Sequence, residues 1–340
     1  MINALIYLTV ILAIVLIARL VRVYELSTEL RGEKEHTVSE SDNRTQAGLM
    51  LGFVVLFFAA VIYMVLAWKD LLLPESASAH GVDIDRLMNF NLLIIFIVFF
   101  ITNALLFFFA FKYYYRKNNR ATFFAHSNKL EFVWTSIPAI VLAVIIIYGL
   151  ITWNDIMGAP SEEAINVELY SKQFDWTARY PGADGQYGES NYLFIGGGND
   201  LGLDTLDQAS WDDVIVKGEF VIPVNREVNF QFRSRDVIHS AYMPHFRAQM
   251  NCVPGMVTNF HFTPTITTAE MRQKLDNEEF NYVVLCNKIC GAAHWNMQID
   301  IVVVSEEEYE TWLAEQKVFK ADKLAELNSA KSVDNLVANN

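Results

Sequence analysis

The sequence predicts an α-helical membrane anchor with four transmembrane helices, followed by an all-β domain outside the membrane. Three observations lead to this prediction. Of the 340 residues 53% are hydrophobic, and the mean hydropathy is +0.22, which is unusual for a soluble domain. Apolar residues of the first half gather in four long runs, whereas those of the second half alternate in short ones. The charge divides at the same place, because residues 1–154 hold 12 Lys and Arg against 11 Asp and Glu, and residues 155–340 hold 14 against 28.

The membrane helices are predicted from runs of about 20 residues, the length that crosses a hydrocarbon core of about 30 Å. In the third run Asn103 interrupts the apolar sequence near its middle, and Pro138 lies near the start of the fourth. Four such runs in one chain favour membrane spans over the buried helices of a soluble protein. The runs cover residues 4–24, 48–68, 90–111 and 132–153.

Basic residues in the connecting loops predict the orientation in the membrane. The loops at 19–47 and 112–129 each hold five Lys and Arg, whereas the loop at 69–89 holds two. Basic loops stay on the cytoplasmic side, so we expect the N-terminus and the C-terminal domain on the outside. The first run is not typical of a signal peptide, since its positive charges follow the apolar stretch.

The second half shows the period-two alternation of β-strands bounded by Gly, Pro and Asn. Many short strands without helical periodicity predict a β-sandwich or barrel. The acidic, glycine-rich segment 182–218 is expected to be a solvated insertion, with a docking surface as the alternative. Ser305 and Glu308 have the spacing of a helix capping box, and the tail at 320–340 is polar. The expected strands are 166–171, 174–180, 227–234, 256–263, 280–286 and 297–304.

The excess of acidic residues in this half is unsuited to nucleic acid and suits a basic partner.

The residues that indicate chemistry lie between the last two expected strands. Cys286, Cys290, His294 and Met297 fall within twelve residues, and His239 lies 47 residues upstream of Cys286. Sulfur and imidazole ligands suit copper, and a Met beside Cys and His is typical of an electron-transfer copper. Two thiolates on one loop can bridge two coppers, each with one His, leaving Met297 and a backbone carbonyl as weak ligands.

Three other interpretations compete with copper. Cys286 and Cys290 could form a disulfide, which an oxidising exterior permits. With His239 and His294 they could form a structural zinc site. They could also be core residues, since free Cys is often buried. The ordered Cys-x3-Cys-x3-His-x2-Met pattern with an upstream His favours copper over all three.

Residues 90–315 resemble subunit II of the haem–copper (cytochrome c) oxidases. The motifs that carry the resemblance are LEFVWTSIPAIVL at 130–142, DVIHS and FRAQMNCVPGM within 236–256, and the Cys/His/Met loop. The family implies a cupredoxin-like Greek-key domain on a two-helix hairpin, and an electron-transfer function at a binuclear CuA centre. The domains expected on this basis are an extra N-terminal region (1–88), the hairpin (89–155), the exported domain (156–308) and a C-terminal helix and tail (309–340).

The same resemblance implies the site residues. The copper ligands would be His239, Cys286, Cys290, His294 and Met297, together with the backbone carbonyl of Lys288. Phe174 and Trp176 match the aromatic stretch where electrons enter, although the family has Trp at the first of these positions. Glu131 matches a carboxylate at the mouth of a proton channel, and a helix-capping carboxylate is the alternative.

Two departures from the family concern cofactors and assembly. Lys288 stands where the family usually has the Glu that reaches magnesium, so that ligand is lost and the Lys288 ammonium offers a positive charge in its place. The first two helices are additional and are expected to contact another component, such as a respiratory supercomplex, or to face lipid. No Cys-x-x-Cys-His occurs in this sequence, which excludes a c-type haem attached through that motif.

We therefore expect a subunit of a terminal respiratory oxidase in a bacterial inner membrane. It would take electrons from a c-type cytochrome and pass them to haem in subunit I, which with other oxidase subunits reduces oxygen. A copper-free structural subunit of a quinol oxidase is the alternative, and retention of the five side-chain ligands argues against it. A membrane-anchored copper-assembly protein is a third possibility, which gives the motif at 130–142 no role.

Overall fold

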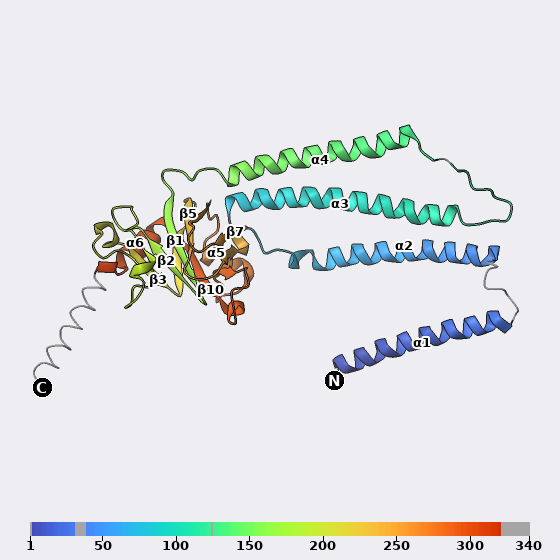
Figure 1. Cartoon of the computed structure of the whole chain (residues 1–340), viewed down its shortest axis with the longest axis horizontal. Coiled ribbons are helices and arrows are strands. Elements are labelled where there is room, and N and C mark those ends of the chain that lie inside the picture. The colour runs from blue at the N-terminus through green and yellow to red at the C-terminus, as the bar shows by residue number, and fades with distance from the viewer. Residues whose placement is uncertain (1, 31–38, 124, 321–340) are drawn as a thin grey trace, which may run out of the picture. The chain divides into compact units, whose positions relative to one another are not determined.

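A computed structural model describes residues 2–30, 39–123 and 125–320, and Figure 1 shows its helices and strands. Each predicted membrane run lies in a long helix, and each of these helices is long and apolar enough to cross a membrane. The helices extend beyond the apolar runs because polar flanking residues continue the backbone hydrogen bonding. Their bounds are α1 (Ile2–Leu30), α2 (Glu40–Trp68), α3 (Ala79–Lys112) and α4 (Asn128–Ile156).

Phenylalanine rings join α2 to the second half of α3. The rings of Phe58 and Phe100 meet edge to face with centroids 4.8 Å apart, and Phe53 lies 5.6 Å from Phe107. The first half of α3 meets α4 through Phe90 and Tyr148, whose centroids lie 5.8 Å apart. Aromatic pairs at such distances add attraction beyond their buried area.

The all-β domain is a sandwich of two five-stranded sheets, which confirms the predicted fold class of an apolar helical anchor and a β domain. The first sheet has the order β3-β2-β1-β5-β8 and the second has β4-β10-β9-β6-β7. The strands are β1 (Ile165–Lys172), β2 (Asp175–Tyr180), β3 (Val214–Lys217), β4 (Glu219–Pro223), β5 (Val228–Ser234), β6 (His239–Met243), β7 (Ala248–Cys252), β8 (Thr258–Phe262), β9 (Tyr282–Cys286) and β10 (Gln298–Val304).

The core lies between the sheets, and alternation along the strands builds it. On β5, Val228, Phe230 and Phe232 are buried while Asn229 and Gln231 are half-buried on the other face. Val284 and Ile301 contribute from the second sheet. β3, β4 and β7 were not expected as strands, whereas β6 carries His239, which was expected on a strand. Each has only four or five residues, too few for a clear alternation, and pairing with neighbouring strands stabilises them.

The segment 182–218 differs from the expected solvated insertion. Leu201 and Leu203 are buried in a small cluster with Tyr170 and Phe319, and the end of the segment forms β3. The expectation is wrong for this part because the segment folds back over the first sheet.

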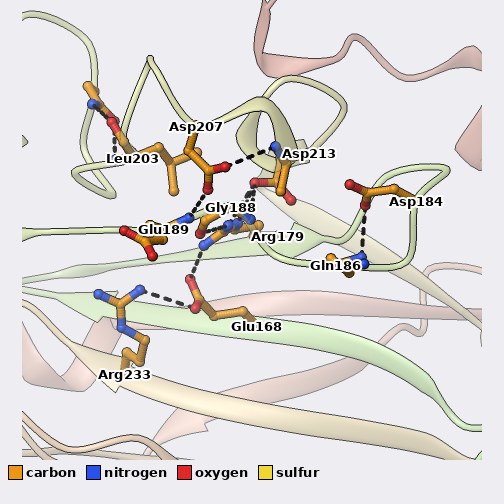
Figure 2. A network of polar contacts seen from close by, with 12 residues as sticks. Glu168, Arg179, Asp184, Gln186, Gly188, Glu189, Leu203, Asp207, Asp213 and Arg233 are labelled. Atoms are coloured by element: carbon orange, nitrogen blue, oxygen red, sulfur yellow. Dashed lines mark hydrogen bonds and ion pairs between the residues drawn. The ribbon is translucent and has the colours of Figure 1, made fainter.

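A buried ion-pair network attaches the same segment to the first sheet (Figure 2). The Arg179 guanidinium lies 2.7 Å from Asp213 and 3.6 Å from Glu168, and all three side chains are at most 3% exposed. Arg233 lies 3.2 Å from the other Glu168 oxygen. Because a buried charge is tolerated only when paired, the network requires the segment to remain in place.

The connection between α2 and α3 is bound to the β domain. The Ala77 amide donates to the His245 carbonyl over 2.7 Å, and the Ala77 carbonyl accepts from the Thr265 amide over 2.8 Å. The Arg247 guanidinium donates to both carboxylate oxygens of Asp85 over 2.8 and 2.9 Å. These contacts fix the domain relative to the first turns of α3.

Two short helices complete the domain. They are α5 (Thr268–Leu275) and α6 (Glu306–Glu315), and the predicted Ser305–Glu308 capping box is confirmed at the start of α6. The predicted polar tail from residue 321 onward lies outside the described residues.

Candidate metal centre

The candidate centre is built from the start of β6 and the loop that joins β9 to β10. β9 ends at Cys286, and a short 3-10 helix at His294–Asn296 (η5) precedes β10. Antiparallel pairing of β6 with β9 sets Ala241 opposite Cys286, so His239 lies beside that thiol. The Cys286 amide donates to the Met297 carbonyl over 3.0 Å, which closes the loop.

Each thiol of the centre has its own histidine and its own weak donor. Cys286 Sγ lies 3.7 Å from His239 Nδ1 and 3.2 Å from the Lys288 carbonyl oxygen. Cys290 Sγ lies 3.5 Å from His294 Nδ1 and 3.8 Å from Met297 Sδ. The two sulfur atoms are 3.8 Å apart. The structure thus brings together every residue that the resemblance implied as a ligand.

The centre is shielded from water on its inner side. His239 is fully buried, and Cys290 and Met297 are at most 5% exposed. Burial, and then the neighbouring Cys286 thiol, raises the pKa of Cys290 to about 11. A thiol with this pKa is protonated near neutral pH, so a metal cation would have to displace the proton to bind it.

The donor set discriminates among the interpretations. A disulfide has sulfur atoms about 2.05 Å apart, whereas Cys286 and Cys290 are free thiols 3.8 Å apart. A structural zinc site takes four Cys or His ligands around one ion, which leaves the Met297 thioether and the Lys288 carbonyl without a role. Thiolates, imidazoles and a thioether together fit copper.

Asp236 and Gln173 support the ligands, and sequence reasoning had not assigned either of them a role. Asp236 Oδ1 accepts from His239 Nε2 over 2.9 Å, which directs Nδ1 toward Cys286. Asp236 Oδ2 accepts from the Gln173 amide over 2.8 Å. The Gln173 side-chain amide donates to the Cys290 carbonyl. The available signal was a carboxylate three residues before a candidate ligand, since metal-binding histidines commonly donate to one.

The predicted aromatic residues lie at two depths. Trp176 is fully buried and meets the His239 ring edge to face with centroids 6.3 Å apart. Phe174 is half-buried and covers Gly291 in the ligand loop. A Cβ at Gly291 would lie 2.8 Å from the Phe174 ring, so this close approach requires glycine.

The other residues singled out from the sequence lie outside the donor set. Cys252 is fully buried opposite His239 on β7, and burial raises the pKa of its thiol to about 12. His245 packs edge to face on Phe280 and Tyr282. His261 bonds to Glu227 and to the Gly158 carbonyl. Glu131 is exposed in the first turn of α4, and its role at a proton channel stays a prediction.

Comparison with known proteins gives two family matches. The family described as "Cytochrome C oxidase subunit II, transmembrane domain" matches residues 66–151, and "Cytochrome C oxidase subunit II, periplasmic domain" matches residues 166–305. Together these matches include α3, most of α4 and the whole candidate centre. Residues before 66 lie outside both.

Two relatives with similar sequences agree with the family matches, and one solved structure is also similar. The "Alternative cytochrome c oxidase subunit 2" of Bradyrhizobium diazoefficiens is 35% identical over 202 residues, 59% of this chain and 68% of that protein. The "Cytochrome c oxidase subunit 2" of Cereibacter sphaeroides is 28% identical over 57% of this chain and 63% of that protein. The crystal structure of the periplasmic domain of subunit II of cytochrome oxidase from Bradyrhizobium japonicum covers 45% of this chain and 94% of that one, with 23% identity and a TM-score of 0.31.

Proposed function

This chain belongs to the cytochrome c oxidase subunit II family and is a membrane-anchored oxidase subunit, and from that premise we propose that it carries the binuclear CuA copper centre through which electrons reach the oxidase. The observation that supports this proposal is the paired donor set: two thiols 3.8 Å apart, each with its own imidazole and its own weak donor.

The residues that would hold the coppers are those of the candidate centre. Cys286 and Cys290 would hold the ions through their thiolates. His239 and the Lys288 carbonyl would complete one set of ligands, and His294 and Met297 the other. When bound, the two coppers supply a one-electron carrier whose charge is shared between two metal ions. Lys288 contributes only its backbone, so the loss of the family's magnesium-binding carboxylate leaves the copper ligands intact.

The protein scaffold would keep the ligands in place during oxidation and reduction. His239 and Cys286 lie on paired strands, and Asp236 holds the His239 ring through Nε2. Ligands held by strands and supporting hydrogen bonds move little when the charge of the site changes. Low reorganisation favours rapid electron transfer.

The placement of Phe174 and Trp176 supports electron transfer from the outer surface. Phe174 is half-buried against Gly291 of the ligand loop, and Trp176 is fully buried against His239. We infer that a c-type cytochrome delivers electrons on this side and that haem in subunit I receives them. The four apolar helices and the loop charges support a bacterial inner membrane, with the N-terminus and the β domain on the periplasmic side. The two extra helices would contact another component of a supercomplex.

The copper-free quinol oxidase subunit is the competing function. A purely structural domain gives no reason for two free thiols, two imidazoles and a thioether to form a chain in which each donor atom lies within 4 Å of the next. The donor distances therefore favour the copper-binding function.

The test compares Cys290→Ser with Cys252→Ala in the purified oxidase. Cys290 is in the donor set, whereas Cys252 is a buried thiol outside it. We expect Cys290→Ser to lose copper from this subunit and oxidation of the donor, and Cys252→Ala to keep both. Copper content and turnover that survive Cys290→Ser would refute the proposal.

A further inference from the structure

A cleft of about 670 Å³ opens on the outer face of the first sheet, and its lining includes Arg235, the residue before Asp236. β1 and β5 line one side of it, the segment 182–218 lines a second, and the turn between β7 and β8 lines a third. We call it the insertion cleft. The lining residues used below are Glu168, Glu189, Tyr192, Arg233, Arg235, Met256 and Val257.

The rim of the insertion cleft has the composition of a protein-binding surface. Tyr192 is 77% exposed, and Met256 and Val257 are also exposed. Leu193 and Phe194 continue the apolar surface from Tyr192. Contiguous exposed apolar residues mark interaction sites, and Tyr, Met and Arg are enriched in protein interfaces.

A cluster of cations borders the cleft at the end nearest the metal ligands. Lys172, Lys217 and Arg235 converge on one carboxylate, that of Asp200, at 2.9, 2.8 and 3.6 Å. Hydrogen bonds from Lys217 and Lys172 lower the pKa of Asp200 to about 2. We call these four residues the Asp200 cluster, and its three cations exceed its one anion.

Most carboxylates near this surface already form ion pairs or hydrogen bonds within the domain. Glu168 is buried and paired with Arg179 and Arg233 (Figure 2). Asp236 accepts from His239 and from two backbone amides. Glu189 is the exposed carboxylate of the lining, and the half-buried Asp175 lies opposite Lys172 in the pairing of β1 with β2. This surface therefore lacks the acidic excess of the domain, in which 28 Asp and Glu face 14 Lys and Arg.

Two members of the Asp200 cluster are sequence neighbours of the groups that support the candidate metal ligands. Lys172 precedes Gln173, whose side chain donates to the Cys290 carbonyl. Arg235 precedes Asp236, the acceptor for His239. The Arg235 amide donates to the Ser171 carbonyl over 2.9 Å, which sets Arg235 beside the end of β1. A protein docked here would lie next to Phe174 and the ligand loop.

We propose that the insertion cleft and the Asp200 cluster form the docking surface for the electron donor, and that the donor presents an acidic contact patch with an apolar centre. The inference rests on the proposed function. The charge of the whole domain predicts a basic partner, but charges within about a Debye length of 8–10 Å of the contact dominate docking.

The test measures binding of two oxidised c-type cytochromes, one acidic and one basic, to the purified oxidase. Oxidised donors bind without transferring electrons, so affinity is read separately from turnover. We expect the acidic cytochrome to bind more tightly and to lose affinity as salt is added.

Variants that remove either a positive or a negative charge from the Asp200 cluster identify the docking surface. Removal of one cation by Lys217→Gln or Arg235→Gln should weaken binding of the acidic cytochrome by about two- to five-fold at low salt, and Asp200→Asn should strengthen it by a similar factor. Arg226→Gln is the matched control, because Arg226 precedes β5 at the end opposite Arg235.

The apolar part of the surface is tested by Tyr192→Ser. Leu206→Ser is its control, since Leu206 is exposed in the same segment and does not line the cleft. We expect weaker binding for Tyr192→Ser alone.

Tighter binding of the basic cytochrome, no binding of either, or variants that act no differently from their controls would overturn the inference. Copper content measured on the same samples separates the two proposals. Absence of copper with the expected binding pattern contradicts the proposed function and supports the docking surface, whereas a full copper complement with no variant effect contradicts the docking surface alone.

Discussion

Asp236→Asn tests how the scaffold supports the metal ligands. The Asp236 carboxylate accepts from His239 Nε2 over 2.9 Å, from the Gln173 amide over 2.8 Å and from the Val237 amide over 2.7 Å. Asparagine keeps one acceptor oxygen for His239 and Val237. It loses the second acceptor, which bonds Gln173, and it loses the negative charge.

The size of the effect follows from the bond that changes most. A hydrogen bond to a charged group contributes about 1.5–3 kcal/mol and a neutral one about 0.5–1.5 kcal/mol. The difference of about 1–1.5 kcal/mol predicts copper affinity lowered about ten-fold, at the lower end of the 10–100-fold typical of groups that support metal ligands. Asp236→Ala, which removes every acceptor, should approach about 100-fold.

Copper titration against a competing chelator measures the affinity, and Asp175→Asn is the control. Asp175 is a nearby carboxylate on β2 that accepts from the Trp176 amide rather than from a ligand. We expect Asp175→Asn to bind copper as the unaltered protein does. Equal affinities for Asp236→Asn and Asp175→Asn would refute the reasoning.

Three further predictions concern the framework around the centre. Arg179→Met leaves the buried Asp213 carboxylate without its cation and Glu168 with Arg233 alone, so unfolding by urea should show a loss of about 3–5 kcal/mol; a loss below 1 kcal/mol would contradict the role given to the network. Burial raises the pKa of Asp213 to about 6, against the opposing attraction of Arg179. Since this folded-state pKa exceeds that of the unfolded chain, the Asp213 contribution to stability should grow as pH falls from 7 through 6 toward 4, and a pH dependence of unfolding unchanged in Asp213→Asn would disprove this. Arg247→Met removes the paired hydrogen bonds to Asp85, and hydrogen exchange should become faster at the backbone amides of the α2–α3 connection while copper content stays unchanged; unaltered exchange would show that this contact does not hold the connection.

The sequence was most informative where a pattern is local. Runs of about 20 apolar residues predict membrane helices without any tertiary information. The spacing of Cys286, Cys290, His294 and Met297 places four donors on one loop, and DVIHS supplies the fifth from a strand. The structure brings all five together, so a ligand set expected from a motif needs only the correct pairing of β6 with β9.

Features that depend on distant partners were not predictable. β3 and β4 have only four and five residues and are stabilised by pairing with β2 and β10, which lie far from them along the chain. The segment 182–218 is acidic and rich in glycine, yet Arg179 and Asp213 bury an ion pair that joins it to the sheet. The cations of the Asp200 cluster come from β1, β3 and the end of β5, so their convergence is visible only after the sheet has formed.

The central claim is that one chain binds two coppers at a shared pair of thiolates. Copper quantitation combined with electron paramagnetic resonance of the purified oxidase, after subtraction of the signals from subunit I, tests it most directly. We expect two coppers per chain in this subunit and a spectrum in which one unpaired electron is shared by two copper nuclei. One copper per chain with a mononuclear spectrum, or no copper in this subunit, would contradict the account.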